Sequence, residues 1–168
     1  MFIYLLRHGI AVMLGQDNHF SDAERALTPE GLTRMKGVSL GLRKLGVTFD
    51  LVVSSPLVRA KETAEIVVDV LKIKEPIQEW DELTPEGSID GVMGQLQSHR
   101  DKTSVLLVGH QPFMGLLACF LIFGSDKVSL AFKKGGICCI QVDEVPPQFA
   151  GELLWMLPPK ILRTLGEK

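Results

Sequence analysis

Two arginines and two histidines stand at or near the ends of apolar segments that are typical of buried strands. They are Arg7, His8, Arg59 and His110. The carboxyl ends of parallel strands lie along one edge of a sheet, and open α/β sheets bind ligands at that edge. Gly9 lets the backbone turn sharply beside such a ligand. The pattern therefore predicts that these four side chains, which come from three distant parts of the sequence, meet in one site.

A site of this composition suits a phosphoryl group. Arginine is planar and permanently charged, so it can bind phosphate oxygens in pairs. A neutral imidazole can attack phosphorus to form a phosphohistidine, which water then hydrolyses. Neighbouring arginines lower the pKa of the attacking histidine and keep it unprotonated, while the other histidine can be cationic and stabilise the phosphoryl oxygens. The residue types alone do not decide which histidine attacks.

Two other interpretations compete with this one. The first is structural: His8 and His110 are packed imidazoles, and Arg59 forms a salt bridge with a neighbour such as Glu62. The second is a zinc site, which needs three or four His, Cys or carboxylate ligands in tight geometry. Because arginines beside the imidazoles would repel a cation, we predict a phosphate site without a metal.

The elements that would position these residues follow from the hydrophobic pattern. Apolar runs predict strands over residues 1–6, 49–54, 76–80, 104–108, 135–142 and 152–156. Apolar spacing and capping residues predict helices over residues 29–45, 55–72, 89–99 and 113–123. Helices that start at Pro56 and Pro112 would aim their N–H groups at an anion. The alternation predicts a single α/β domain, residues 1–168, with a mostly parallel sheet and helices on both faces.

Composition narrows the possible functions. The net charge is −2 and the pI is about 6.1, so nothing indicates binding to nucleic acid or to an anionic membrane surface. The longest apolar run, residues 115–123, is far shorter than the roughly 20 residues of a membrane helix. Met1 opens the first predicted strand and leaves no room for a leader peptide, and three cysteines make no disulfide framework. We therefore expect a cytoplasmic protein with reduced cysteines, mostly in its core.

Five segments, in order, resemble the histidine phosphatase superfamily, whose mark is an Arg-His-Gly after the first strand. They are LLRHGIA, ALTPEGL, SSPLVRAKETA, DELTPEG and LLVGHQP. The similarity is closest to the SixA-type phosphohistidine phosphatases. It implies a phosphoglycerate mutase-like fold, in which helices flank a mostly parallel sheet of about five or six strands in three α/β/α layers.

The resemblance also implies roles for the site residues. His8 would be the nucleophile. Arg7 and Arg59 would bind the phosphoryl group. His110 would be the second histidine, with Gln111 beside it as a further phosphate contact. Neither an organic cofactor nor a metal is implied.

The resemblance bears on the substrate as well. Ile10 and Ala11 follow the Arg-His-Gly as in the SixA-type branch, whereas mutase-like members have an acidic residue there and an asparagine a few positions on. A chain of 168 residues has little to spare for a lid. An open site could admit the phosphohistidine of another protein, such as a phosphotransfer domain. The alternatives are a phosphatase for small phosphomonoesters and, from another class, a module that binds phosphate-bearing partners without turnover.

A general acid is the least defined part of the predicted site. Hydrolysis of a phosphomonoester needs a proton for the leaving alkoxide, whereas phosphohistidine loses a nitrogen leaving group that is easier to expel. Glu82, in the DELTPEG segment, is a tentative acid; a loop carboxylate or a helix-cap partner is the plainer interpretation. Asp17 and His19 lie in a predicted long loop, residues 10–27, and could reach the mouth of the site.

Overall fold

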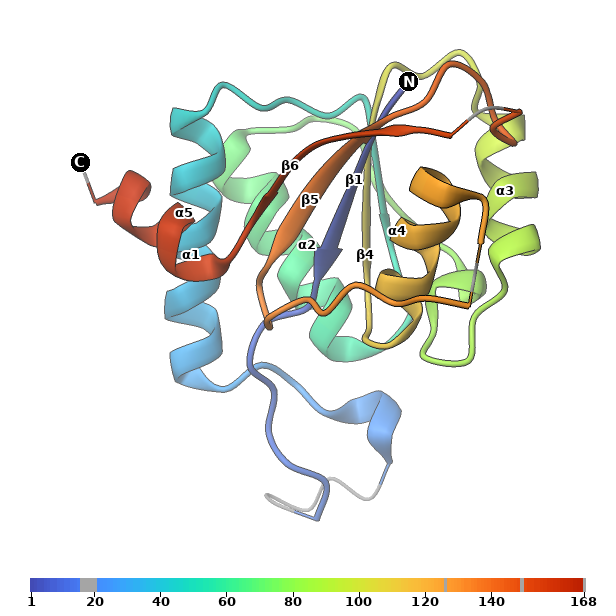
Figure 1. Ribbon diagram of the computed structural model, residues 1–168. Coiled ribbons are helices and arrows are strands. Elements are labelled where there is room, and N and C mark those ends of the chain that lie inside the picture. The colour runs from blue at the N-terminus through green and yellow to red at the C-terminus, as the bar shows by residue number, and fades with distance from the viewer. Residues whose placement is uncertain (16–20, 126, 149, 168) are drawn as a thin grey trace.

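A six-stranded sheet lies between two layers of helices (Figure 1). The computed structural model describes residues 1–15, 21–125, 127–148 and 150–167. The strands are β1 (Phe2–Arg7), β2 (Leu51–Ser54), β3 (Ile77–Glu79), β4 (Ser104–Gly109), β5 (Ile137–Gln141) and β6 (Glu152–Leu157). Their order in the sheet is β3-β2-β4-β1-β5-β6. Each strand lies within one of the predicted apolar runs or extends it by one residue.

Strands β1, β2, β3 and β4 are parallel to one another. At one side of the sheet, β5 pairs antiparallel with β1, and β6 pairs antiparallel with β5. This confirms the prediction of a mostly parallel sheet. The pairing of β1 with β4 matches Arg7 to Gly109. In that register the next residues of the two strands, His8 and His110, leave the sheet side by side.

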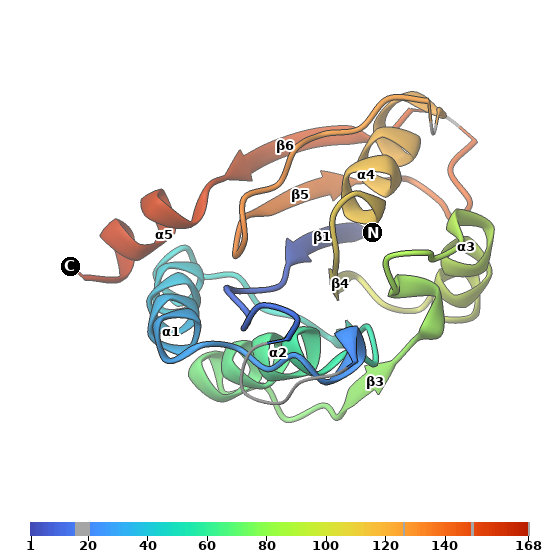
Figure 2. The same ribbon diagram turned by 90° about the horizontal axis from the view of Figure 1, so that it is seen from below.

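Helices cover both faces of the sheet, as Figure 2 shows. On one face lie α1 (Pro29–Lys44), α2 (Val58–Leu71) and α5 (Pro159–Gly166), and on the other lie α3 (Ile89–Ser98) and α4 (Phe113–Phe123). Short 3-10 helices, η1 (Asp22–Glu24) and η2 (Asp81–Leu83), occur in connecting loops. Each face of the sheet has its own buried apolar core. The predicted three-layer α/β/α arrangement is confirmed.

Helix α2 begins at Val58, later than the predicted start at Ser55 and Pro56. The reason is that Ser55 still pairs at the sheet edge, where its N–H donates to the Val108 carbonyl at 2.9 Å. Pro56 therefore precedes the helix instead of opening it. Arg59 becomes the second residue of α2, so its side chain is carried by the first turn.

Helix α5 is absent from the sequence-based prediction. Its 8 residues are few for a helix that is stable by itself. Contact with α1 stabilises it, and Gly41 of α1 allows the close approach. A Cβ at Gly41 would lie 2.1 Å from the carbonyl oxygen of Leu162, a buried residue of α5. The helix therefore depends on a tertiary contact that the local sequence does not reveal.

We predict that Gly41→Ala destabilises the protein although alanine is the better helix former. Overpacking costs about 1–3 kcal/mol, which exceeds the gain of about 1 kcal/mol from helix propensity. Gly94→Ala in α3 is the control, because no atom lies within 4 Å of a Cβ there; it should stabilise by up to about 1 kcal/mol. Urea unfolding measures both changes, and equal stabilisation by the two variants would contradict the prediction.

The cysteines are as expected. Cys119, Cys138 and Cys139 are buried and free.

Among the helices of the described residues, none has the length and apolar character that crossing a bilayer requires.

Candidate active site

His8 is the first residue beyond β1, and its ring is held in one tautomer. The backbone N–H of His8 donates to the Gly109 carbonyl at 3.0 Å, which extends the pairing with β4 by one residue. Arg59 Nε lies 3.3 Å from His8 Nε2. Because a guanidinium can only donate, His8 Nε2 must accept, and the ring proton lies on Nδ1, 2.7 Å from the Gly9 carbonyl oxygen. His8 therefore presents an unprotonated Nε2 beside an arginine.

Arg59 is buried, with 4% of its surface exposed, and a loop residue supplies its counter-charge. Its Nη1 donates to the Asp22 carbonyl at 2.6 Å, and its Nη2 donates to Asp22 Oδ2 at 2.7 Å. The neighbour considered from the sequence, Glu62, instead accepts from the Leu27 N–H at 2.5 Å. The salt bridge of Arg59 thus comes from η1 and not from its own helix.

His110 is buried next to His8, with ring centroids 5.0 Å apart. Its Nε2 lies 2.8 Å from the Ser55 hydroxyl, and its Nδ1 is buried with no hydrogen-bond partner among the described residues. Arg7 Nη1 donates to the Phe132 carbonyl at 2.6 Å, while Arg7 Nε is buried and likewise has no partner in the described part of the chain. Buried polar atoms nearly always have partners, so these two nitrogens mark a place where a ligand can provide them.

Both histidines are neutral in the free protein at neutral pH. Burial, and then repulsion from His110, Arg59 and Arg7, lowers the pKa of His8 to about 3. Burial and Arg59 likewise lower the pKa of His110 to about 3. The sequence-based expectation of one neutral imidazole therefore holds, but the second is not cationic here, because His110 is as desolvated as His8 and faces the same arginine.

Comparisons with known proteins agree with this geometry. Residues 3–85 match the model of the histidine phosphatase superfamily, branch 1. An uncharacterized protein of Picosynechococcus sp. is 34% identical over 96% of this chain and 99% of its own length. The chain belongs to the histidine phosphatase superfamily. The phosphohistidine phosphatase SixA of Escherichia coli is 29% identical over 95% of this chain and 94% of its own length.

Solved structures of this superfamily share the fold. The protein histidine phosphatase SixA complexed with tungstate has a TM-score of 0.84 at 29% identity, covering 96% of this chain and 99% of that one. Phosphoglycerate mutase from Bacillus anthracis has a TM-score of 0.72 at 13% identity, covering 100% and 97%, and shows the fold alone. The phosphoglycerate mutase-like fold implied by the sequence motifs is confirmed.

Gln111 makes its hydrogen bonds within the protein. Its Nε2 donates to the Leu130 carbonyl at 2.9 Å, and its Oε1 accepts from the Phe132 N–H at 3.5 Å. The Phe132 carbonyl in turn accepts from Arg7. Gln111 thus holds the segment that holds Arg7, and its predicted contact with phosphate stays a prediction.

Glu82 has a hydrogen-bond partner in a neighbouring helix. In η2, its Oε1 accepts from Gln95 Nε2 of α3 at 3.1 Å. A Cβ at Gly91 would lie 2.6 Å from Glu82 Cγ, so the side chain packs closely against the start of α3. The role of Glu82 as an acid stays a prediction. Asp17 and His19 lie outside the described residues.

Sequence reasoning missed two polar residues of the site, Ser55 and Asp22. Ser55 follows β2 as His8 follows β1, and this shared position is a signal that could have found it. Asp22 lies in a loop, and nothing in its local pattern points to Arg59. Within the described part of the chain, no group of three or more His, Cys, Asp or Glu side chains is placed to hold a metal ion.

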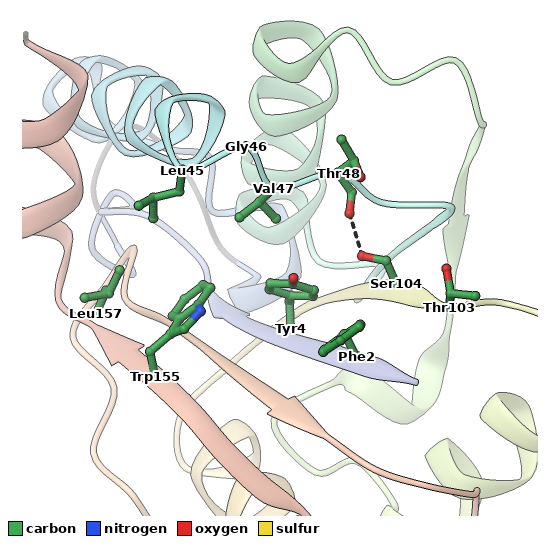
Figure 3. Close-up of a pocket in the computed structure, with 10 residues that line it drawn as sticks. All are labelled: Phe2, Tyr4, Leu45, Gly46, Val47, Thr48, Thr103, Ser104, Trp155 and Leu157. Atoms are coloured by element: carbon green, nitrogen blue, oxygen red, sulfur yellow. Dashed lines mark hydrogen bonds between the residues drawn. The ribbon is translucent and has the colours of Figure 1, made fainter.

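A pocket of about 490 Å³ lies at the opposite edge of the sheet (Figure 3). Phe2 and Tyr4, near the start of β1, line it together with Trp155 of β6. The Tyr4 ring packs edge-on against the Phe49 ring, and the two ring centroids are 5.0 Å apart. His8 follows the other end of β1, several residues of about 3.3 Å each away. This pocket is therefore separate from the candidate active site.

We predict that the two histidines make the protein less stable as the pH falls. Unfolded histidine has a pKa of 6.5 and folded His8 about 3, so between these values the unfolded state binds more protons and gains stability. From pH 7 to pH 5 this costs up to about 2 kcal/mol per histidine. Urea unfolding of wild type and His8→Asn at both pH values isolates the part of this loss in unfolding free energy that His8 causes. An unchanged pH dependence in the variant would contradict the prediction.

We predict that Asp22→Asn strengthens oxyanion binding. Removing one negative charge beside Arg59 should tighten binding of inorganic phosphate or tungstate about three- to tenfold, on the order of 1 kcal/mol. Isothermal titration calorimetry measures the change. Asp69→Asn is the matched control, because Asp69 pairs with Lys72 on the exposed end of α2. Weaker binding by Asp22→Asn would mean that Asp22 instead holds Arg59 in its binding geometry.

Proposed function

We propose that this protein removes phosphate from phosphohistidine on another protein, with His8 as the nucleophile. The observation that carries the proposal is the unprotonated Nε2 of His8 beside Arg59 and His110. Neutrality and position are the two properties that an attacking imidazole needs. Similarity to SixA of Escherichia coli over nearly the whole chain supports the substrate class.

In the first step, Arg59 Nε–H gives up its hydrogen bond to His8 Nε2 and donates to a phosphoryl oxygen instead, and the freed Nε2 lone pair attacks phosphorus. The bond between phosphorus and the substrate imidazole breaks, and its electron pair leaves with the substrate nitrogen, which takes a proton from solvent. Phospho-His8 carries its positive charge partly on Nδ1–H, and the Gly9 carbonyl, 2.7 Å away, stabilises it. In the second step, water attacks phosphorus, the His8–phosphorus bond breaks, and inorganic phosphate and a proton leave.

Arg7, Arg59 and His110 stabilise the phosphoryl oxygens in both steps. Neutral His110 can do so only as a donor. The Ser55 hydroxyl oxygen accepts from the Leu57 N–H at 3.4 Å, and its O–H can donate to His110 Nε2, 2.8 Å away. The proposed mechanism uses this arrangement, in which the His110 proton is on Nδ1. Ser55 thus acts as a positioning residue.

The leaving group separates the proposed substrate from small phosphomonoesters. An alkoxide needs a general acid, whose removal costs about 10²–10⁴-fold in rate. The Glu82 carboxylate is bonded to Gln95 and not to a site residue. A substrate with a nitrogen leaving group fits a site without a strong acid.

We predict that the protein releases phosphate from a phosphotransfer domain phosphorylated on histidine, with EDTA present. His8→Ala should lower the rate by at least about 10³-fold, since the covalent route is lost. Glu82→Gln should change it by less than about threefold, far below the effect of losing a general acid. Glu86→Gln in the same segment is the matched control.

A panel of small phosphomonoesters is assayed beside the protein substrate. Faster turnover of the small esters, together with a large loss in Glu82→Gln, would replace the proposed substrate with a metabolite ester. Binding of the phosphorylated domain by wild type and by His8→Ala alike, with no phosphate released by either, would contradict an enzymatic function.

A further inference from the structure

A cluster of cations that the proposed reaction does not use lies beside Arg7. It surrounds a groove of about 570 Å³, which we call the basic groove. The basic side chains that line it are Arg7, Arg34, Lys133, Lys134, Lys160 and Arg163. They come from the end of β1, from α1, from the turn before β5 and from α5, which Figures 1 and 2 place together at one end of the molecule. Because Arg7 belongs to both, the basic groove adjoins the candidate active site.

Hydrogen bonds hold two of the lysines close to Arg7. Arg7 Nη1 donates to the Phe132 carbonyl at 2.6 Å. The Gly135 N–H donates to the Arg7 carbonyl at 3.0 Å. Lys133 and Lys134 lie between these two anchors, so the backbone that carries them is held beside Arg7.

The basic groove carries more positive charge than nearby carboxylates neutralise. Glu30 pairs with Arg34 at 2.5 Å. In the described residues, no carboxylate forms a salt bridge with Lys133, Lys134, Lys160 or Arg163. The Nε of Arg163 is buried without a partner. This charge is concentrated on a chain whose net charge is −2, so it is a local feature that attracts an anionic partner.

The cations of the basic groove and of the active site act on each other. Burial, and then the positive charges of Arg7, Arg25 and Arg59, lowers the pKa of Lys134. The two sites therefore share one region of positive potential. An anionic molecule that carries a phosphoryl group to His8 would meet both.

The lining of the basic groove favours a protein segment over a small polyanion. Ile10, Pro158 and Pro159 give it an apolar part. The lysines around it are exposed. A small polyanion has no group that would contact the apolar part, whereas a protein segment can place an apolar side chain between acidic ones.

We propose that the basic groove binds an acidic segment of the protein substrate, with an apolar side chain against Ile10, Pro158 and Pro159 and carboxylates against the lysines. This inference rests on the proposed function, because it names the surface through which the phosphohistidine protein docks. The groove then selects protein substrates by the charge beside their phosphohistidine. It also raises the rate of encounter, in a manner that salt weakens.

Binding is tested without any reaction. Short fluorescein-labelled peptides, one with glutamates around a leucine and one with glutamines in their place, are titrated with the protein at low salt and at about 0.15 M salt. We expect fluorescence anisotropy to show binding of the acidic peptide that weakens with salt. Lys133→Glu/Lys160→Glu should weaken it about tenfold or more, since two attractions become repulsions.

Lys44→Glu/Lys74→Glu is the matched control, with the same change in net charge. Both lysines are exposed, and neither lines the basic groove. This variant should bind the acidic peptide within about twofold of wild type. Equal losses in both double variants, or equal binding of the two peptides, would overturn the proposal. Displacement of the acidic peptide by inorganic tripolyphosphate, at concentrations below the peptide's own Kd, would replace the protein partner with a small polyanion.

Turnover separates this proposal from the proposed function. The same two peptides, each with a phosphohistidine, are assayed for phosphate release beside para-nitrophenyl phosphate. We expect the lysine-to-glutamate pair in the groove to lower kcat/KM about tenfold for the acidic peptide and by a clearly smaller factor for the small ester, which meets the shared positive potential but not the groove. Groove-dependent binding without phosphohistidine hydrolysis would refute the proposed function and leave the docking surface. Hydrolysis of both peptides at one rate would refute the docking surface and leave the function.

Discussion

The parallel pairing of β1 with β4 is the constraint on which the candidate active site depends. Arg7 lies opposite Gly109, so His8 and His110 leave the sheet as neighbours with ring centroids 5.0 Å apart. A shift of one residue would turn every side chain of β1 to the other face of the sheet. Both strands are deeply buried, and this makes such a shift costly. The apolar core therefore fixes the geometry of the polar residues that follow it.

Burial creates the chemical character of the site as well as its shape. Desolvation is the first cause of the low pKa of both His8 and His110, and the arginines act in the same direction. The price is a buried guanidinium at Arg59, which must have a counter-charge. Asp22 supplies it from a loop, at 2.7 Å. A substrate phosphoryl group and the Asp22 carboxylate would therefore compete for the same arginine.

The segment before β5 links three parts of the molecule. Gln111, next to the second histidine, forms hydrogen bonds with the backbone of Leu130 and Phe132. The Phe132 carbonyl in turn accepts a hydrogen bond from Arg7. The lysines that follow Phe132 face α5 across the basic groove. Arg7 is thus the point at which the active site, this segment and the proposed docking surface meet. A substrate that docks on the groove would contact Arg7, the residue proposed to bind its phosphoryl group.

The sequence by itself determined the features that depend on local pattern. Apolar runs predicted the six strands and the layer arrangement, and the residues after those strands predicted that Arg7, His8, Arg59 and His110 meet. The last inference rests on parallel strands sharing an edge, so that residues distant in sequence become neighbours by topology alone. His8 lies beside Arg59 and His110 in this way. The motifs after four of the strands, together with the one at the start of α1, were also specific enough to indicate the superfamily.

Only the tertiary structure decided which groups touch. Asp22 rather than Glu62 pairs with Arg59, because side-chain partners come from whichever loop packs nearby. Ser55 stays with the sheet and sets the tautomer proposed for His110, so α2 begins later than its own sequence suggests. Helix α5 forms against α1 although it is short, and with it the basic groove appears. Contacts between elements distant in the chain carry these features, and no local pattern encodes such contacts.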